Sequence, residues 1–244
     1  MKKILIVNLI GETDIKVITD AYPKLSQNSV VIDFIHGDRE GIDDDYAGII
    51  ITGSPTHIYE KKENPWIIEI EKYMEKWLDR DVPVLGICFG IQLYADLEGR
   101  EVMQNKIGRN MGRAQMVLEN NVDRNHYIFK DINFESREIE VFCSHLYHVE
   151  PAPSVCGYLK TSGDQKIPML EINGSFVGTQ FHPEFSTCQG LEVLKNLVDR
   201  RRQLLNADSK HPNQIILDLT LAQEKCDNPL SFKFLTNFVD HCLR

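Results

Sequence analysis

A cysteine flanked by two glycines stands in the segment VPVLGICFGIQL. Cys88 ends a short apolar run, with Gly86 two residues before it and Gly90 two residues after it. A strand that enters Gly-x-Cys-x-Gly and continues as a helix is the pattern of a nucleophile elbow, in which a tight turn exposes the nucleophile. The N-terminus of the helix would also lower the thiol pKa and increase the fraction of thiolate. Cys88 is therefore a candidate nucleophile, although a buried structural cysteine would leave the same local pattern.

A second segment, GTQFHPEFS, offers the base that a thiol nucleophile needs. His182 follows a predicted strand, and Glu184 lies two residues further on. We expect Pro183 to keep the chain extended, so that both side chains project to the same side. Glu184 would then fix the tautomer of His182 and stabilise its imidazolium, and His182 would act first as general base and then as general acid. A surface hydrogen bond between the two residues is the alternative.

The elements that must position these residues alternate along the chain. Short runs rich in β-branched residues are separated by amphipathic runs, which is the pattern of βαβ units around a parallel sheet. Three strand-like pieces in the middle of the chain favour an antiparallel layer. The predicted strands are 3–9, 30–36, 47–53, 82–87, 114–119, 137–145 and 176–182, and the predicted helices lie within 14–25, 64–83, 89–99 and 190–205.

The composition excludes several classes of function. The chain has 244 residues and a formal net charge of −9, which argues against a nucleic-acid-binding surface. The run Arg200-Arg201-Arg202 is interpreted as a solvated helix end. The apolar stretch ILIVNLI is too short for a membrane span, so we expect a cytoplasmic protein. The six cysteines form no C-x-x-C pair and are expected to be reduced thiols.

The two segments together resemble a known family. GICFGIQL and GTQFHPE are similar to the two signature motifs of the class I glutamine amidotransferases, the Cys-His-Glu triad domains found in enzymes such as GMP synthetase. The resemblance extends from about Lys3 to Leu205. It implies a three-layer, flavodoxin-like α/β fold, with a mostly parallel sheet between helices and a small antiparallel sheet. It also implies a catalytic triad of Cys88, His182 and Glu184, and no cofactor.

The segment IIITGSP is a third landmark of the resemblance. It implies that the oxyanion of the reaction is held by the backbone amides of Ser54 and Phe89, with Gly53 in the substrate site. The family more often has Gly-Gly-Pro here, so the serine leaves open whether the loop presents its amide without a trigger.

Further substrate contacts follow from the resemblance. Gln92 would contact the bound glutamine, and Ser144 and His145 would lie at its amino-acid end. Tyr147 stands where some members of the family have an acidic residue. This difference leaves open how the α-amino group of the bound glutamine is recognised. The alternative of a zinc site at Cys143, His145 and His148 is disfavoured, because the spacing lacks a consistent strand face and a fourth ligand.

Residues 1–205 are expected to form the amidotransferase domain, and 206–244 a linker and a helical extension that packs against it or offers an interface.

The fate of the released nitrogen is open. No ATP-pyrophosphatase loop or Walker A loop is present. The chain would therefore be a glutaminase that passes ammonia to a separate synthetase. The alternatives are a stand-alone γ-glutamyl peptidase, which parts of the sequence resemble, and a non-catalytic regulatory protein on the same fold.

Overall fold

The structure is a computed structural model. The residues that it describes are 2–10, 12–20, 22–106, 108–133, 135–161, 166–201, 203, 212–224 and 230–244. The predicted boundary at 205/206, most of the predicted linker, Arg202 and Cys226 lie outside these ranges. No helix within them is both long enough and apolar enough to cross a bilayer.

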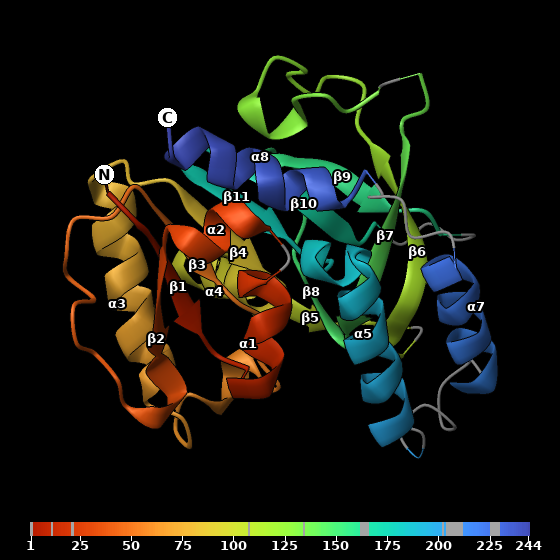
Figure 1. The fold of residues 1–244 in the computed structure, drawn as a ribbon, viewed down its shortest axis with the longest axis horizontal. Coiled ribbons are helices and arrows are strands. Elements are labelled where there is room, and N and C mark those ends of the chain that lie inside the picture. The colour runs from red at the N-terminus through yellow and green to blue at the C-terminus, as the bar shows by residue number, and fades with distance from the viewer. Residues whose placement is uncertain are drawn as a thin grey trace.

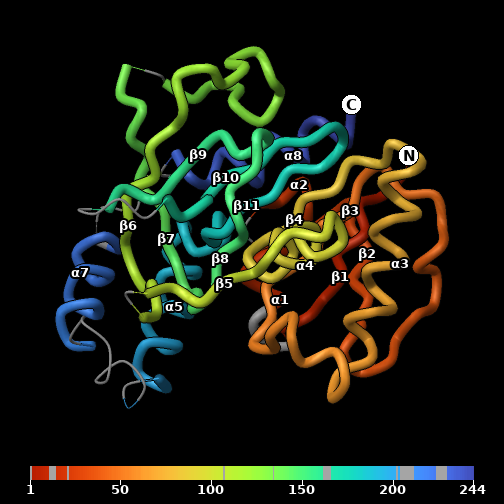
Figure 2. The backbone as a smooth tube through the Cα atoms, turned by 180° about the vertical axis from the view of Figure 1, so that it is seen from behind, coloured from red at the N-terminus to blue at the C-terminus, as the bar shows by residue number. Residues whose placement is uncertain are grey.

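The main sheet contains nine strands within the described residues (Figures 1 and 2). Its first five strands in spatial order run parallel, and the other four continue the same sheet in antiparallel pairs. The predicted α/β class is confirmed, but most of the antiparallel strands extend the main sheet instead of forming a separate layer. The order is β2 (Ser29–Asp33), β1 (Ile4–Asn8), β3 (Gly48–Ile51), β4 (Val84–Ile87), β11 (Phe176–Thr179), β10 (Pro168–Asn173), β9 (Val155–Leu159), β6 (Asn110–Leu118) and β7 (Glu138–His145). A separate antiparallel pair is formed by β5 (Val102–Gln104) and β8 (Tyr147–Val149).

Helices cover both faces of the parallel half. In β1, Ile4 and Ile6 belong to the apolar cluster on one face and Leu5 and Val7 to the cluster on the other, as the two-residue period of a strand requires. Figures 1 and 2 show these faces from opposite sides. The first face packs against α1 (Glu12–Thr19), α2 (Pro23–Gln27) and α8 (Phe232–Cys242), and the second against α3 (Trp66–Asp79) and α4 (Phe89–Leu97).

Two predicted elements are shorter than expected. The helix predicted over 14–25 is wrong as a single element, because α1 ends at Thr19 and α2 begins at Pro23. Tyr22 is extended, with φ −138° and ψ 113°, which is the conformation that a following proline favours. The strand predicted over 30–36 ends at Asp33 and gives way to the short 3₁₀ helix η1 (Phe34–His36).

The C-terminal helices pack on the rest of the chain. The helix α7 (Pro212–Glu224) lies against α5 (Cys188–Arg200) and β6 (Figure 1). The helix α8 belongs to the same apolar cluster as β1 and β4, and Phe234, Leu235 and Phe238 are fully buried. The side-chain amide of Asn237 donates hydrogen bonds to two backbone carbonyls. One belongs to Ile128 in η3 (Tyr127–Phe129), and the other to Lys130, which follows η3.

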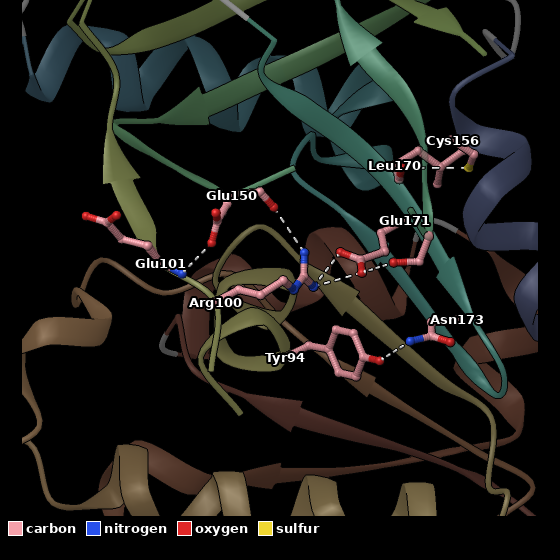
Figure 3. Close-up of polar contacts among 9 residues, drawn as sticks. Tyr94, Arg100, Glu101, Glu150, Cys156, Leu170, Glu171 and Asn173 are labelled. Carbon is pink, nitrogen blue, oxygen red and sulfur yellow. Dashed lines mark hydrogen bonds and ion pairs between the residues drawn. The ribbon is translucent and has the colours of Figure 1, made fainter. Parts of the chain in front are cut away.

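A buried ion pair fixes the chain just beyond α4 (Figure 3). Gly99 has φ +71° and follows the end of the helix, as the sequence predicts. The next residue, Arg100, donates to both carboxylate oxygens of Glu171 at 2.8 and 2.9 Å and to the backbone carbonyl of Glu150 at 3.1 Å. The Glu171 side chain is 1% exposed, and burying its carboxylate would cost much free energy without a partner. The paired hydrogen bonds from Arg100 offset this cost. The pair ties α4, whose first residue follows Cys88, to β10.

Candidate active site

Cys88 occupies a sharp turn between β4 and α4. It has φ +51° and ψ −87°, a conformation that costs a non-glycine residue on the order of 1–3 kcal/mol. Its N–H donates to the carbonyl of Thr179 at 2.6 Å, which holds the turn against β11. A Cβ on Gly86 would lie 2.7 Å from the backbone of Gly90, so the strand and the helix can approach this closely only without a side chain there. The local pattern predicted from the sequence is therefore present in the structure.

His182 and Glu184 lie together next to this turn. The Nδ1 atom of His182 and the Oε1 atom of Glu184 are 2.7 Å apart, and both residues are buried. Phe185 stacks on the imidazole, with ring centroids 4.5 Å apart. The expectation that Pro183 keeps the chain extended is wrong, because η4 (Pro183–Ser186) is a 3₁₀ turn and only His182 is extended. The turn still brings both side chains to the same place.

The histidine and the cysteine converge on one point. A Cβ built on Gly53 would lie 3.0 Å from Cε1 of His182 and 3.6 Å from Cβ of Cys88. Burial alone would lower the pKa of His182, but the negative charges of Glu184 and the Cys88 thiolate outweigh it and raise this pKa to about 10. The Nε2 atom is buried and has no hydrogen-bond partner of ordinary geometry within the described residues. The site therefore favours the imidazolium form of His182.

The loop after β3 forms another wall of the site. The hydroxyl of Thr52 donates to the carbonyl of Gly53 at 3.0 Å and accepts from the N–H of Leu9 at 2.9 Å. The peptide is trans, so the N–H of Ser54 lies on the side away from that hydroxyl. Phe89 begins α4, and its N–H therefore has no acceptor within the helix. Both predicted oxyanion donors come from backbone at the edge of the cavities described next; their role stays a prediction.

A small cavity beside Cys88 brings together three of the four predicted substrate contacts, while Gly53 lines the neighbouring cavity. The volume of the small cavity is about 40 Å³, and Gln92, Ser144 and His145 all line it. His145 is 2% exposed, and burial lowers its pKa to about 3, so it is neutral. Its Nδ1 then donates to the carbonyl of Tyr147 at 2.9 Å, and its Nε2 accepts from Asn110 at 3.2 Å. Gln92 donates to the same carbonyl at 3.3 Å.

A second cavity, of about 100 Å³, also borders Cys88 and shares Ser54, Pro55, Ser144 and Arg201 with the first. His182 and Glu184 line it, together with Arg201. Reading Arg201 as part of a solvated helix end is wrong, since its Nη1 atom donates to the hydroxyl of Ser144 at 3.2 Å. Its neighbour Arg200 is exposed, as predicted.

Three polar residues of the site were missed by the sequence analysis. For Arg201 a signal existed, because Val193, Leu197 and Arg201 are spaced four residues apart and all three line the second cavity. The other two are Thr52 and Gln180, whose side-chain amide approaches Sγ of Cys88 at 3.6 Å. Their roles depend on contacts across strands that no local pattern encodes.

The chain is similar in sequence to known proteins. The family model "Glutamine amidotransferase class-I" matches residues 6–200. GMP synthase [glutamine-hydrolyzing] from Cytophaga hutchinsonii is 35% identical over 159 residues, which are 64% of this chain and 28% of that protein. Gamma-glutamyl peptidase 3 from Arabidopsis thaliana is 27% identical over 157 residues, which are 64% of this chain and 60% of that protein.

The fold has solved counterparts. A glutamine amidotransferase from Thermotoga maritima has a TM-score of 0.76 and 18% sequence identity, with 98% of both chains covered. The match to the family model spans both the Cys88 turn and the His182–Glu184 pair. The chain belongs to the class I glutamine amidotransferase family.

Proposed function

We propose that this protein hydrolyses the γ-amide bond of glutamine or of a γ-glutamyl compound through a thioester on Cys88. The observation that carries the proposal is the meeting of a strained, helix-capping cysteine with a buried histidine–glutamate pair. A residue is held at positive φ only where the surrounding structure enforces it, and such strain gathers at functional sites. The raised pKa of His182 supports the same assignment, because it favours the imidazolium that would protonate the leaving nitrogen.

In the first half of the proposed reaction, the Cys88 thiolate attacks the γ-carbonyl carbon. The resulting oxyanion accepts hydrogen bonds from the N–H groups of Ser54 and Phe89. When the tetrahedral intermediate collapses, the C–N bond breaks, and the imidazolium of His182 gives its proton to the leaving nitrogen. In the second half, His182 takes a proton from water as the water attacks the thioester. Glutamate leaves, and the thiolate and imidazolium are restored.

Glu184 would act on His182 through both its hydrogen bond and its charge. Glu184 holds the Nδ1–H of His182, so that Nε2 faces the reacting atoms. Gln92, Ser144 and His145 would contact the glutamyl group. His145 is neutral, so it contributes hydrogen bonds and shape and no charge.

Two versions of the proposal differ in what leaves with the nitrogen. In the first, ammonia is released and a separate synthetase uses it; the likeness to GMP synthases supports this version. In the second, a larger amine is released, as in a γ-glutamyl peptidase; the likeness to such a peptidase and the cavity of about 100 Å³ beside His182 support it.

The test compares the purified protein with two cysteine variants on glutamine and γ-glutamyl dipeptides. We expect Cys88→Ala to abolish release of glutamate with an unchanged melting temperature. Cys188→Ala, which removes an exposed cysteine, is the matched control and should keep the wild-type rate. A folded Cys88→Ala protein that still turns over would refute the proposal, and would leave a non-catalytic cysteine on this fold as the better account.

A further inference from the structure

We infer that the C-terminal helix α8 positions the η4 turn, and that it does so through Ser231, the residue before the helix. The η4 turn follows His182 and contains Glu184. This role rests on the proposed function, in which Ser231 would be a positioning residue. Ser231 lies beyond the match to the family model, which ends at residue 200.

A buried pair of hydroxyl groups joins α8 to the η4 turn. The Oγ atoms of Ser186 and Ser231 are 2.6 Å apart, and the two residues are 1% and 0% exposed. Ser186 is the last residue of the η4 turn. Bulk water is excluded from both hydroxyls, so each satisfies its hydrogen-bonding capacity through the other.

Ser231 occupies the N-cap position of α8 but does not cap the helix. A serine at this position usually accepts a hydrogen bond from the backbone N–H two or three residues further on, which stabilises the helix. The side chain of Ser231 makes no such bond, and its backbone is helical, with φ −63° and ψ −25°. Its hydroxyl bonds instead to Ser186, in a segment that is distant along the chain. This choice of partner favours a role in holding the η4 turn.

The first turn of α8 makes a second contact with the same segment. Phe234 packs against Phe181 edge to face, with ring centroids 5.4 Å apart, and both side chains are fully buried. Phe181 directly precedes His182. The helix therefore holds the chain on both sides of the histidine, at Phe181 before it and at Ser186 after it.

The η4 turn is packed so closely that a shift at one end would reach the other. A Cβ on Gly190 would lie 2.2 Å from the carbonyl oxygen of Glu184, so the first turn of α5 lies directly against the η4 turn. The N–H of Phe185 donates to the carbonyl of His182 at 3.1 Å. Interiors packed at this density transmit a displacement and do not absorb it locally. Loss of the bond at Ser186 should therefore move the carboxylate of Glu184 relative to the imidazole of His182.

The helix α8 is itself fixed against parts of the chain outside the site. Asp240 accepts hydrogen bonds from the hydroxyl of Tyr22 at 3.0 Å and from Nζ of Lys24 at 2.7 Å. Asn237 donates to two backbone carbonyls at and after η3. These contacts give α8 the fixed placement that a support for the η4 turn requires.

The experiment removes the two hydroxyls singly and together. We measure kcat and KM for release of glutamate in the wild type, Ser186→Ala, Ser231→Ala and the double variant, on glutamine and on γ-glutamyl-leucine. From the strength of one buried hydrogen bond, we expect each single variant to lower kcat by about two- to tenfold and to change KM by less than about twofold. The double variant should fall no further than either single variant, because the two hydroxyls make one bond.

A pH profile separates positioning from a general loss of stability. If the η4 turn shifts, Glu184 holds His182 less well, so the alkaline limb of kcat/KM should lie at lower pH in Ser231→Ala than in the wild type. Thr236→Ala removes a hydroxyl that bonds within α8 and should keep the wild-type kcat and limb. Phe238→Ala removes a fully buried side chain near the start of β3, and should lower the melting temperature without moving the limb.

Failure of this inference differs from failure of the proposed function. If Ser231→Ala keeps the wild-type kcat and pH profile, or if the effects of the two single variants add in the double variant, the inference is wrong and the proposed function stands. Either single variant removes the bond, so Ser186→Ala decides alone if Ser231→Ala does not fold. A wild-type protein inactive on both substrates, or a folded Cys88→Ala variant as active as the wild type, would overturn both.

Discussion

Replacing Glu184 with glutamine tests whether its charge sets the protonation of the histidine. The substitution keeps the shape of the side chain and removes the charge that lies 2.7 Å from Nδ1 of His182. A hydrogen bond between charged groups contributes about 1.5–3 kcal/mol, and one pKa unit corresponds to about 1.4 kcal/mol. The pKa of His182, now raised to about 10, should therefore fall by roughly 1–2 units in Glu184→Gln.

The assay is the pH dependence of kcat/KM for release of glutamate. The imidazolium is the proton donor to the leaving group, so activity falls as the pH rises through the pKa of His182. We expect the alkaline limb of the wild-type profile near pH 10, and that of Glu184→Gln between about pH 8 and 9. Glu192→Gln removes an exposed carboxylate of α5 and should leave the limb in place. An alkaline limb that does not move in a folded Glu184→Gln protein would refute this reasoning.

Two further predictions concern stability. Burial, aided by a hydrogen bond with Asp96 and opposed by Lys61, raises the pKa of Glu71 to about 7, so the folded state holds this proton at a higher pH than the unfolded state does. The free energy of unfolding should therefore fall as the pH rises from about 4.5 through about 7. Urea titrations at pH 5 and pH 8 measure this fall, and Glu71→Gln should reduce it by at most about 3 kcal/mol. An equal pH dependence in the wild type and in Glu71→Gln would contradict this prediction. Phe238→Ala in α8 should cost about 3–5 kcal/mol of unfolding free energy in the same titrations, because Phe238 is fully buried, whereas Leu217→Ala at an exposed site of α7 should cost less than about 0.5 kcal/mol. A small effect of Phe238→Ala would mean that α8 contributes little to the core.

The placement of Cys88, His182 and Glu184 could be predicted because its signals are local. The turn at Cys88 is encoded in twelve consecutive residues, in which an apolar strand, two glycines and an amphipathic helix follow one another. His182 and Glu184 are two residues apart. The meeting of the two segments follows from topology, since parallel strands β4 and β11 are neighbours and both end at the same edge of the sheet.

The remaining features depend on contacts between distant segments. The antiparallel strands look alike whether they form a layer of their own or extend the main sheet, and only pairing of β10 with β11 decides between the two. Arg201 looked solvated because three arginines in a row are usual at a helix end. Its contact with Ser144 depends on how α5 packs against β7, which the sequence of α5 alone does not specify.

The most direct test of the account is to trap the thioester. The protein is mixed with glutamine or γ-glutamyl-leucine, quenched in acid during turnover, digested, and analysed by mass spectrometry. The account predicts a γ-glutamyl group on the peptide that contains Cys88, absent from Cys88→Ala and present in Cys188→Ala. A γ-glutamyl group on a different cysteine, or turnover without any adduct by a folded Cys88→Ala protein, would contradict it.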